Sequence, residues 1–133
     1  MCNCLKTILR LNSLSCIGFG FAFALAPESI GSFLDGIPPV ILRWIGIGLA
    51  LNGFHLVIAS FRKKIRKFEL GYFIIGDLLW VLSSIILTTL VSEVIYSPPA
   101  IATTLAVALL VGSFAALQIY WGRSILTSSR PQW

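Results

Sequence analysis

Apolar residues run along this chain in four long stretches that are separated by short polar connections. Each stretch has about 22 to 24 residues, so as an α-helix it would measure about 33 to 36 Å and cross the ~30 Å hydrocarbon core of a membrane. The pattern therefore predicts an all-α integral membrane four-helix bundle, with residues 1–133 forming a single membrane domain. The predicted spans are approximately 5–26, 39–61, 70–91 and 99–122.

Strands do not fit this pattern. A membrane β-barrel needs segments of about ten residues in which lipid-facing apolar and lumen-facing polar positions alternate. The run Leu105-Ala106-Val107-Ala108-Leu109-Leu110 is continuously apolar instead. Helical spans remain the interpretation.

Composition agrees with a chain that lies in lipid. Apolar residues make up 57% of the 133 residues and charged residues only 11%, whereas a soluble domain has roughly a quarter charged residues. The net charge is +5, but the basic residues gather in one short run and do not cover a face. A soluble fold and a nucleic-acid partner are therefore excluded.

The positions of the basic residues predict the orientation of the spans. Five lie in the connection between the second and third spans, and Lys6, Arg10, Arg123 and Arg130 lie toward the two chain ends. Four crossings would bring all nine to one side, which the positive-inside rule places in the cytoplasm. We therefore expect both termini in the cytoplasm. Arg43 is the exception, and we expect it to reach the outer interface or to pair with Glu28 or Glu93.

Proline residues mark the outer ends of the predicted helices. Pro27 should end the first helix, Pro38-Pro39 should open the second and Pro98-Pro99 the fourth, since proline is tolerated in a first helical turn. Between the first two spans, apolar residues follow the i, i+3, i+4, i+7 spacing of one helix face. They predict a short interfacial helix in the first outer loop, with Ile30, Phe33, Leu34 and Ile37 on its apolar side.

The first span also has the form of a secretory signal. It has a basic start, an apolar middle and a small-residue site at Ala24-Leu25-Ala26. Pro27 directly after that site disfavours cleavage, and the apolar stretch is long for a signal. We expect a retained helix.

Small residues spaced four apart predict close helix packing in lipid, where apolar burial contributes little to association. The first span offers Cys16, Gly20 and Ala24, with a neighbouring stripe of small residues beside them. The fourth span offers a similar stripe. The members of that stripe are Ala108, Gly112 and Ala116.

Polar residues within the spans predict one layer in the inner half of the bundle. A strongly polar side chain near the middle of a span costs about 2.5 to 3.5 kcal/mol on insertion scales, so each needs a partner or a function. In the first hypothesis Arg10 pairs with Asp77. The side chains of His55, Asn52 and Gln118 then complete a ligand-binding pocket. In the alternative the same contacts only hold the helices together. The candidate ligand-binding residues are Arg10, Asn52, His55, Asp77 and Gln118.

His55 is the only histidine. One imidazole nitrogen suffices as an axial ligand to a haem or chlorophyll, so attachment of a pigment or haem through His55 is a further hypothesis. The more common role is a simple hydrogen bond. No cofactor is required by the sequence. Cys2 and Cys4 lack the histidine or carboxylate neighbours of a zinc site, so no metal site is expected.

The connection between the second and third spans predicts contact with anionic lipid head groups, at about 1 kcal/mol per basic residue near the surface. No nucleotide-binding, zinc-protease or serine-hydrolase motif occurs in the chain, so these enzyme classes are not indicated. The candidate lipid-binding residues are Arg62, Lys63, Lys64, Arg66 and Lys67.

Three segments resemble a known group. The chain is similar, over nearly its whole length, to a group of uncharacterised small bacterial four-transmembrane-helix proteins and, more distantly, to the DoxX-like class. The segments are Arg43-Trp44-Ile45-Gly46-Ile47-Gly48, Gly76-Asp77-Leu78-Leu79-Trp80-Val81 and Ala116-Leu117-Gln118. DoxX-like proteins are associated with quinone or thiol oxidation, but no matching redox residues occur here, so the resemblance implies the fold alone.

Together these features predict a multi-pass protein of a bacterial cytoplasmic (inner) membrane, with membrane lipids as partners. The extramembrane parts are too short to hold a soluble active site, which favours a non-catalytic accessory or scaffolding subunit of a larger membrane complex, or a homo-oligomer. The alternative is a quinone, lipid or proton carrier, or an oxidoreductase component, that uses the inner polar layer.

Overall fold

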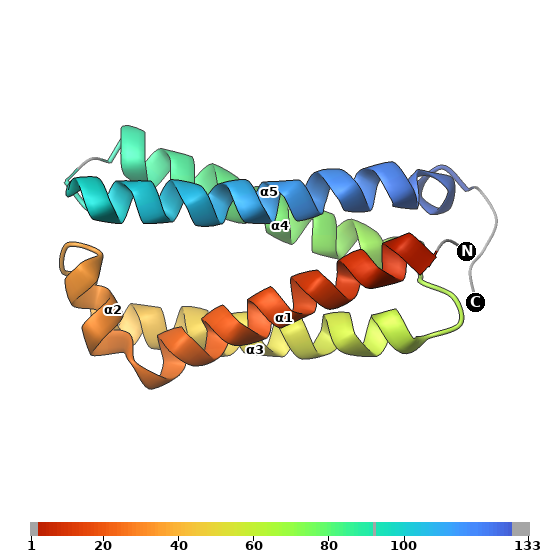
Figure 1. The fold of residues 1–133 in the computed structure, drawn as a ribbon, viewed down its shortest axis with the longest axis horizontal. Helices are drawn as coiled ribbons and strands as arrows, with labels where there is room; N and C mark the ends of the chain where they lie inside the picture. Colours follow the sequence, from red (N-terminus) through yellow and green to blue (C-terminus); the bar gives the residue numbers. More distant parts are fainter. Residues whose placement is uncertain (1–2, 92, 129–133) are drawn as a thin grey trace.

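The computed structural model describes residues 3–91 and 93–128, and every regular element within them is helical. Four of the five helices are long and apolar enough to cross a membrane, so the predicted all-α fold with four candidate spans is confirmed. Cys2 and Arg130 lie outside the described residues. In chain order the helices are α1 (Asn3–Leu25), α2 (Pro27–Phe33), α3 (Pro39–Phe61), α4 (Lys67–Thr89) and α5 (Pro98–Leu126) (Figure 1).

Three of the four long helices begin one to three residues before the spans predicted for them. The prediction for α3 coincides with its bounds, but α4 begins at Lys67 and not at residue 70, and α5 continues to Leu126 and not to residue 122. Hydropathy identifies only the apolar part of a helix, whereas the helical backbone hydrogen bonds continue into terminal turns that contain basic residues. Arg123 in the last turn of α5 also lies where a cation favours the helix dipole.

The short helix is present, but it begins and ends earlier than predicted. α2 opens with Pro27 in its first turn and ends at Phe33. The chain then turns, because Asp35 and Gly36 adopt positive φ angles of 62° and 89°. A right-handed helix cannot continue through such angles. Ile37 therefore lies beyond the helix. Proline also opens α3 and α5, as predicted.

The long helices form two pairs. α1 packs along α3, and α4 packs along α5, while α1 and α5 provide the main contact between the pairs. α2 packs on α3 and α1. Figure 1 shows that the pairs approach each other where α1 begins and lie farther apart toward α2. The helices α3 and α4 follow each other in the chain but are not a closely packed pair.

Glycine allows the backbones of α1 and α3 to approach closely. A Cβ atom on Gly20 would lie 2.6 Å from the backbone nitrogen of Ala50, and one on Gly46 would lie 2.6 Å from the backbone nitrogen of Ala24. A Cβ atom on Gly53 would likewise lie 2.6 Å from Ile17. The predicted small-residue face of the first span is thus the face that packs against α3.

An apolar cluster closes one end of the bundle. Leu5 and Leu9 of α1, Ile65 of the α3–α4 connection and Leu70 of α4 are almost fully buried there, and Ile125 of α5 packs against them. The start of α1, the α3–α4 connection and the end of α5 therefore lie at the same end (Figure 1). We name it the basic end. Its defining residues are Arg62, Lys63, Lys64, Arg66 and Lys67.

At the opposite end, one carboxylate joins two connections. Asp35 Oδ2 accepts hydrogen bonds from the backbone N–H groups of Tyr96 (2.7 Å) and Ser97 (2.8 Å). The N–H group of Ser97 is the main reason why the pKa of the Asp35 carboxyl lies below its ordinary value. Nearby, Arg43 pairs with Glu28 at 3.5 Å, which confirms one of the two predicted partners of this arginine.

Replacing Gly46 by alanine should destabilise the protein, whereas replacing Gly48 should not. A Cβ atom at Gly46 would clash with the backbone of α1, but one at Gly48 meets no atom within 4 Å. Overpacking costs about 1 to 3 kcal/mol, while alanine for glycine in an unhindered helix gains up to about 1 kcal/mol. Reversible unfolding in detergent measures both variants. Equal stabilities would contradict the close α1–α3 packing.

Candidate functional site

The Asp77 carboxylate lies in the middle of α4 and joins this helix to two others. Its Oδ2 atom accepts hydrogen bonds from Asn12 Nδ2 of α1 (2.8 Å) and from Gln118 Nε2 of α5 (2.7 Å). All three side chains are buried, with 5%, 1% and 0% of their surface exposed in the order Asp77, Asn12 and Gln118. Both distances are at the short end of the N–H···O range.

The network continues to α3 through a cysteine. The Cys16 thiol donates to Asn12 Oδ1 at 3.6 Å, and Asn52 Nδ2 donates to Cys16 Sγ at 3.7 Å. Asp77 is therefore linked, directly or through other side chains, to all of the long helices. We name these residues the Asp77 network. Its members are Asn12, Cys16, Asn52, Asp77 and Gln118.

The observed helix bounds place this network near the middle of the bundle. At 1.5 Å per residue, its amide and carboxylate side chains lie about 12 to 15 Å from the nearer helix ends, whereas His55 lies about 9 Å from the end of α3. The single predicted layer is therefore divided in two. Asn52, Asp77 and Gln118 come together, and His55 and Arg10 do not join them.

The predicted pair of Arg10 and Asp77 does not form. Arg10 is exposed, and its guanidinium lies 4.7 Å from the centre of the Phe61 ring. Arg10 and Asn12 are two positions apart, so their side chains point about 200° apart around α1. Because Asn12 faces Asp77, Arg10 must face away. The prediction was wrong because it used depth alone and ignored rotation around the helix.

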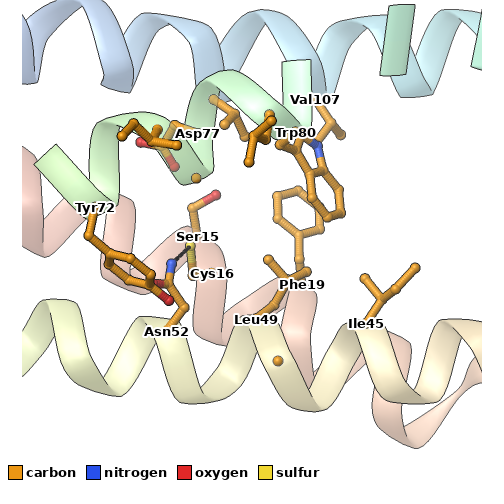
Figure 2. A pocket seen from close by; sticks show the side chains of 15 residues that line it. Ser15, Cys16, Phe19, Ile45, Leu49, Asn52, Tyr72, Asp77, Trp80 and Val107 are labelled. Atoms are coloured by element: carbon orange, nitrogen blue, oxygen red, sulfur yellow. Dashed lines mark hydrogen bonds between the residues drawn. The ribbon is translucent and has the colours of Figure 1, made fainter. Parts of the chain in front are cut away.

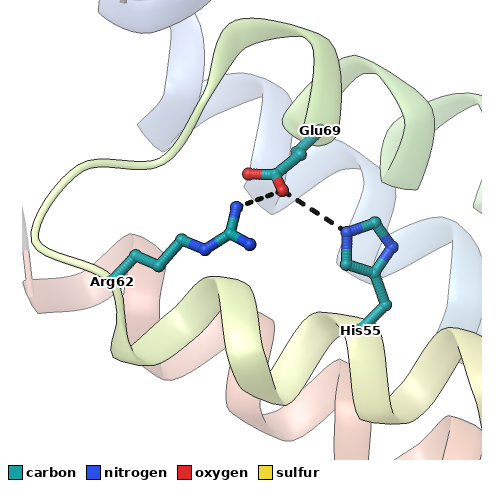
Figure 3. A network of polar contacts seen from close by, with 3 residues as sticks. All are labelled: His55, Arg62 and Glu69. Atoms are coloured by element: carbon teal, nitrogen blue, oxygen red, sulfur yellow. Dashed lines mark hydrogen bonds and ion pairs between the residues drawn. The ribbon is translucent and has the colours of Figure 1, made fainter. Parts of the chain in front are cut away.

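His55 belongs instead to a charged cluster at the basic end (Figure 3). Glu69 Oε1 contacts Arg62 Nη1 and lies 3.4 Å from His55 Nε2. The imidazole ring also packs edge-on against Phe73, with the ring centres 5.0 Å apart. Attachment of a haem or pigment through Nε2 would have to displace Glu69. Arg62, one of the predicted lipid-binding residues, is partly occupied by the same carboxylate.

A cleft of about 400 Å³ lies between the two helix pairs, beside the Asp77 network (Figure 2). Its walls are mostly apolar, and its polar groups include Cys16, Asn52 and Asp77. Glycines widen it from both sides, because a Cβ atom on Gly48 of α3 or on Gly76 of α4 would meet no atom within 4 Å. Volumes of this size are typical of small-molecule sites.

One oxygen of Asp77 remains available in this cleft. Both hydrogen bonds to the carboxylate end on Oδ2, and no described residue donates to Oδ1. The described side-chain atoms that are fully buried without a partner are Glu69 Oε2 and Gln118 Oε1, so Asp77 Oδ1 is not fully buried, and Asp77 is one of the residues that line the cleft. The residue is thus both a structural junction and part of a cavity wall.

Sequence reasoning missed Asn12 and Cys16 as members of this site. From the sequence, Cys16 is predicted only as a small packing residue, and Asn12 is not among the candidate ligand-binding residues. Their spacing of four residues, which puts both on one face of α1, was the available signal. The cleft had no sequence signal, because it depends on how the two pairs are placed relative to each other.

No three His, Cys, Asp or Glu side chains gather to hold a metal ion within residues 3–91 and 93–128. No protein-family model, curated protein or solved structure matches the chain. The DoxX-like resemblance therefore stays a prediction, and the arguments about function depend on the site itself.

Replacing Asn12 or Gln118 by leucine should destabilise the bundle by about 0.6 to 1.7 kcal/mol each, the range measured for polar contacts between membrane helices. Both donors share Oδ2, so the two effects should not add in the double variant. Ser113→Ala is the control, since that hydroxyl bonds only within α5. Unfolding in detergent measures the free energy of unfolding of the two single variants, the double variant and the control. Additive losses, or none, would disprove the junction.

Proposed function

We propose that this chain is a multi-pass protein of a bacterial cytoplasmic membrane that binds a lipophilic small molecule in the cleft between its helix pairs. The observation that carries the proposal is a mostly apolar cavity of about 400 Å³ with a carboxylate in its wall at mid-helix depth. An ionisable group at that depth is costly in a membrane and commonly marks a functional site. Among the sequence hypotheses, this proposal favours the carrier over the structural contact alone.

The proposed orientation puts the basic end in the cytoplasm. The described basic residues lie at or near that end except for Arg43, which pairs with Glu28 at the other. The positive-inside rule supports this orientation. In the same frame α2 lies along the outer interface, where its exposed Phe33 reaches lipid. Lys63, Lys64 and Arg66 are exposed and would contact anionic head groups.

An accessory or scaffolding role, or a homo-oligomer, is the second candidate. A shallow groove of about 440 Å³ runs along α4 and α5, and its lining includes the predicted small residues Ala108, Gly112 and Ala116. Small residues permit close approach of another helix. This role predicts a stable partner subunit in mild-detergent extracts, whereas the proposed function predicts a bound small molecule.

Filling the cleft should remove the ligand without unfolding the protein. Gly76→Leu places an apolar side chain in open space, and Gly18→Leu, also in open space but outside the cleft wall, is the matched control. Mass spectrometry of lipophilic molecules released from protein purified out of native membranes is the measurement. Wild type and Gly18→Leu should retain a near-stoichiometric molecule that Gly76→Leu lacks. The same content in all three would contradict the proposal.

A reporter fused after Trp133 tests the orientation. Green fluorescent protein should fluoresce there and alkaline phosphatase should be inactive, because only a cytoplasmic location gives both results in bacteria. An active phosphatase would place the basic end outside and would overturn the proposed topology.

A further inference from the structure

The cleft contains a carboxylate that no described cation neutralises. Arg43 pairs with Glu28, and Arg62 pairs with Glu69. Arg10 lies over Phe61. Asp77 receives only the two neutral amide donors, both on Oδ2. Charged groups inside spans usually pair with an opposite charge, and Asp77 has no such partner among the described residues.

We propose that the ligand of this cleft is a lipophilic organic cation, an amine, quaternary ammonium or phosphonium with apolar substituents, whose charge is held by the Asp77 carboxylate and by aromatic rings beside it. This inference rests on the proposed function, because it assigns a chemical class to the molecule that the cleft binds. Oδ1, to which no described residue donates a hydrogen bond, provides the acceptor for an N–H group or the counter-charge for a quaternary centre.

Aromatic rings line the same cavity. Trp80 follows Asp77 by three positions and so lies on the same side of α4, while Tyr72 and Phe19 complete the wall from α4 and α1 (Figure 2). Trp80 is supported by stacking against Phe23, with ring centres 6.4 Å apart. The face of an aromatic ring attracts a cation, most strongly where water is excluded. The cavity thus combines a counter-charge, ring faces and apolar surface.

Other ligand classes fit these groups less well. A fatty acid or phospholipid head group would bring a negative charge toward Asp77. A quinone carbonyl could accept from the Asn52 amide, but it cannot bond an ionised carboxylate and would leave the charge of Asp77 without a partner. A metal ion would find too few ligands, because no three metal-binding side chains gather among the described residues. A neutral lipophile fills the cleft but leaves the carboxylate without a partner.

The test is binding of tetraphenylphosphonium to the full-length protein in detergent at neutral pH, measured by equilibrium dialysis. Wild type should bind it saturably, and Asp77→Asn should weaken binding at least tenfold. The asparagine oxygen can still accept from Asn12 and Gln118, so this variant keeps the junction. Asp77→Glu should restore most of the affinity, which separates loss of charge from loss of fold. Glu28→Gln, a carboxylate change outside the cleft, should bind like wild type.

Two further measurements test the aromatic contact and the charge separately. Trp80→Leu should weaken tetraphenylphosphonium binding by about 3- to 30-fold, the range expected for a cation–π contact. Neutral tetraphenylmethane, which has the same shape but neither charge nor hydrogen-bonding groups, should show no dependence on residue 77. If the cation binds wild type and Asp77→Asn equally, or fails to bind while a neutral molecule still occupies the cleft, the inference is overturned and the proposed function stands. If Gly76→Leu still binds the cation and still retains the neutral molecule, both the inference and the proposed function are contradicted.

Discussion

The bundle depends on two amide groups that share one carboxylate oxygen in the middle of the four long apolar helices. Lipid chains are as apolar as leucine, so apolar burial does not decide which helix faces turn toward each other. An unpaired carboxylate or amide in hydrocarbon is costly, and this cost fixes the rotation of α1, α4 and α5 around their axes. In this arrangement both Asn12 and Gln118 donate to Asp77 Oδ2.

Two kinds of contact hold the helices together. Glycine packing holds α1 against α3 along much of their length, and the Asp77 network ties this pair to α4 and α5. Since α3 and α4 are not tightly packed, a cleft opens between them directly beside the carboxylate. The same residue therefore explains the cohesion of the bundle and the chemical character of its cavity. A ligand that reached Oδ1 would bind at the junction of the two pairs.

Hydropathy predicted the four long helices well, because a lipid-facing helix must be apolar along most of its surface, and the prolines marked where α3 and α5 begin. The rotation of each helix about its own axis was much harder to predict. Depth alone put Arg10 beside Asp77, although α1 turns Arg10 to the opposite side, toward Phe61. Asn52 and His55 were both expected in the polar layer, but Asn52 bonds to Cys16 whereas His55 contacts Glu69. The cleft depends on the placement of whole helices, which no local pattern encodes.

The most direct test is a distance measurement by solid-state NMR in lipid bilayers. Protein labelled with ¹³C at the carboxyl carbon of Asp77 and with ¹⁵N in its asparagine and glutamine side chains should show dipolar coupling between them, as hydrogen bonds to Oδ2 require. The coupling should fall by about half in Gln118→Leu and vanish when Asn12 is also replaced. Absence of coupling in the wild-type protein would contradict the junction and, with it, the assembly proposed for the bundle.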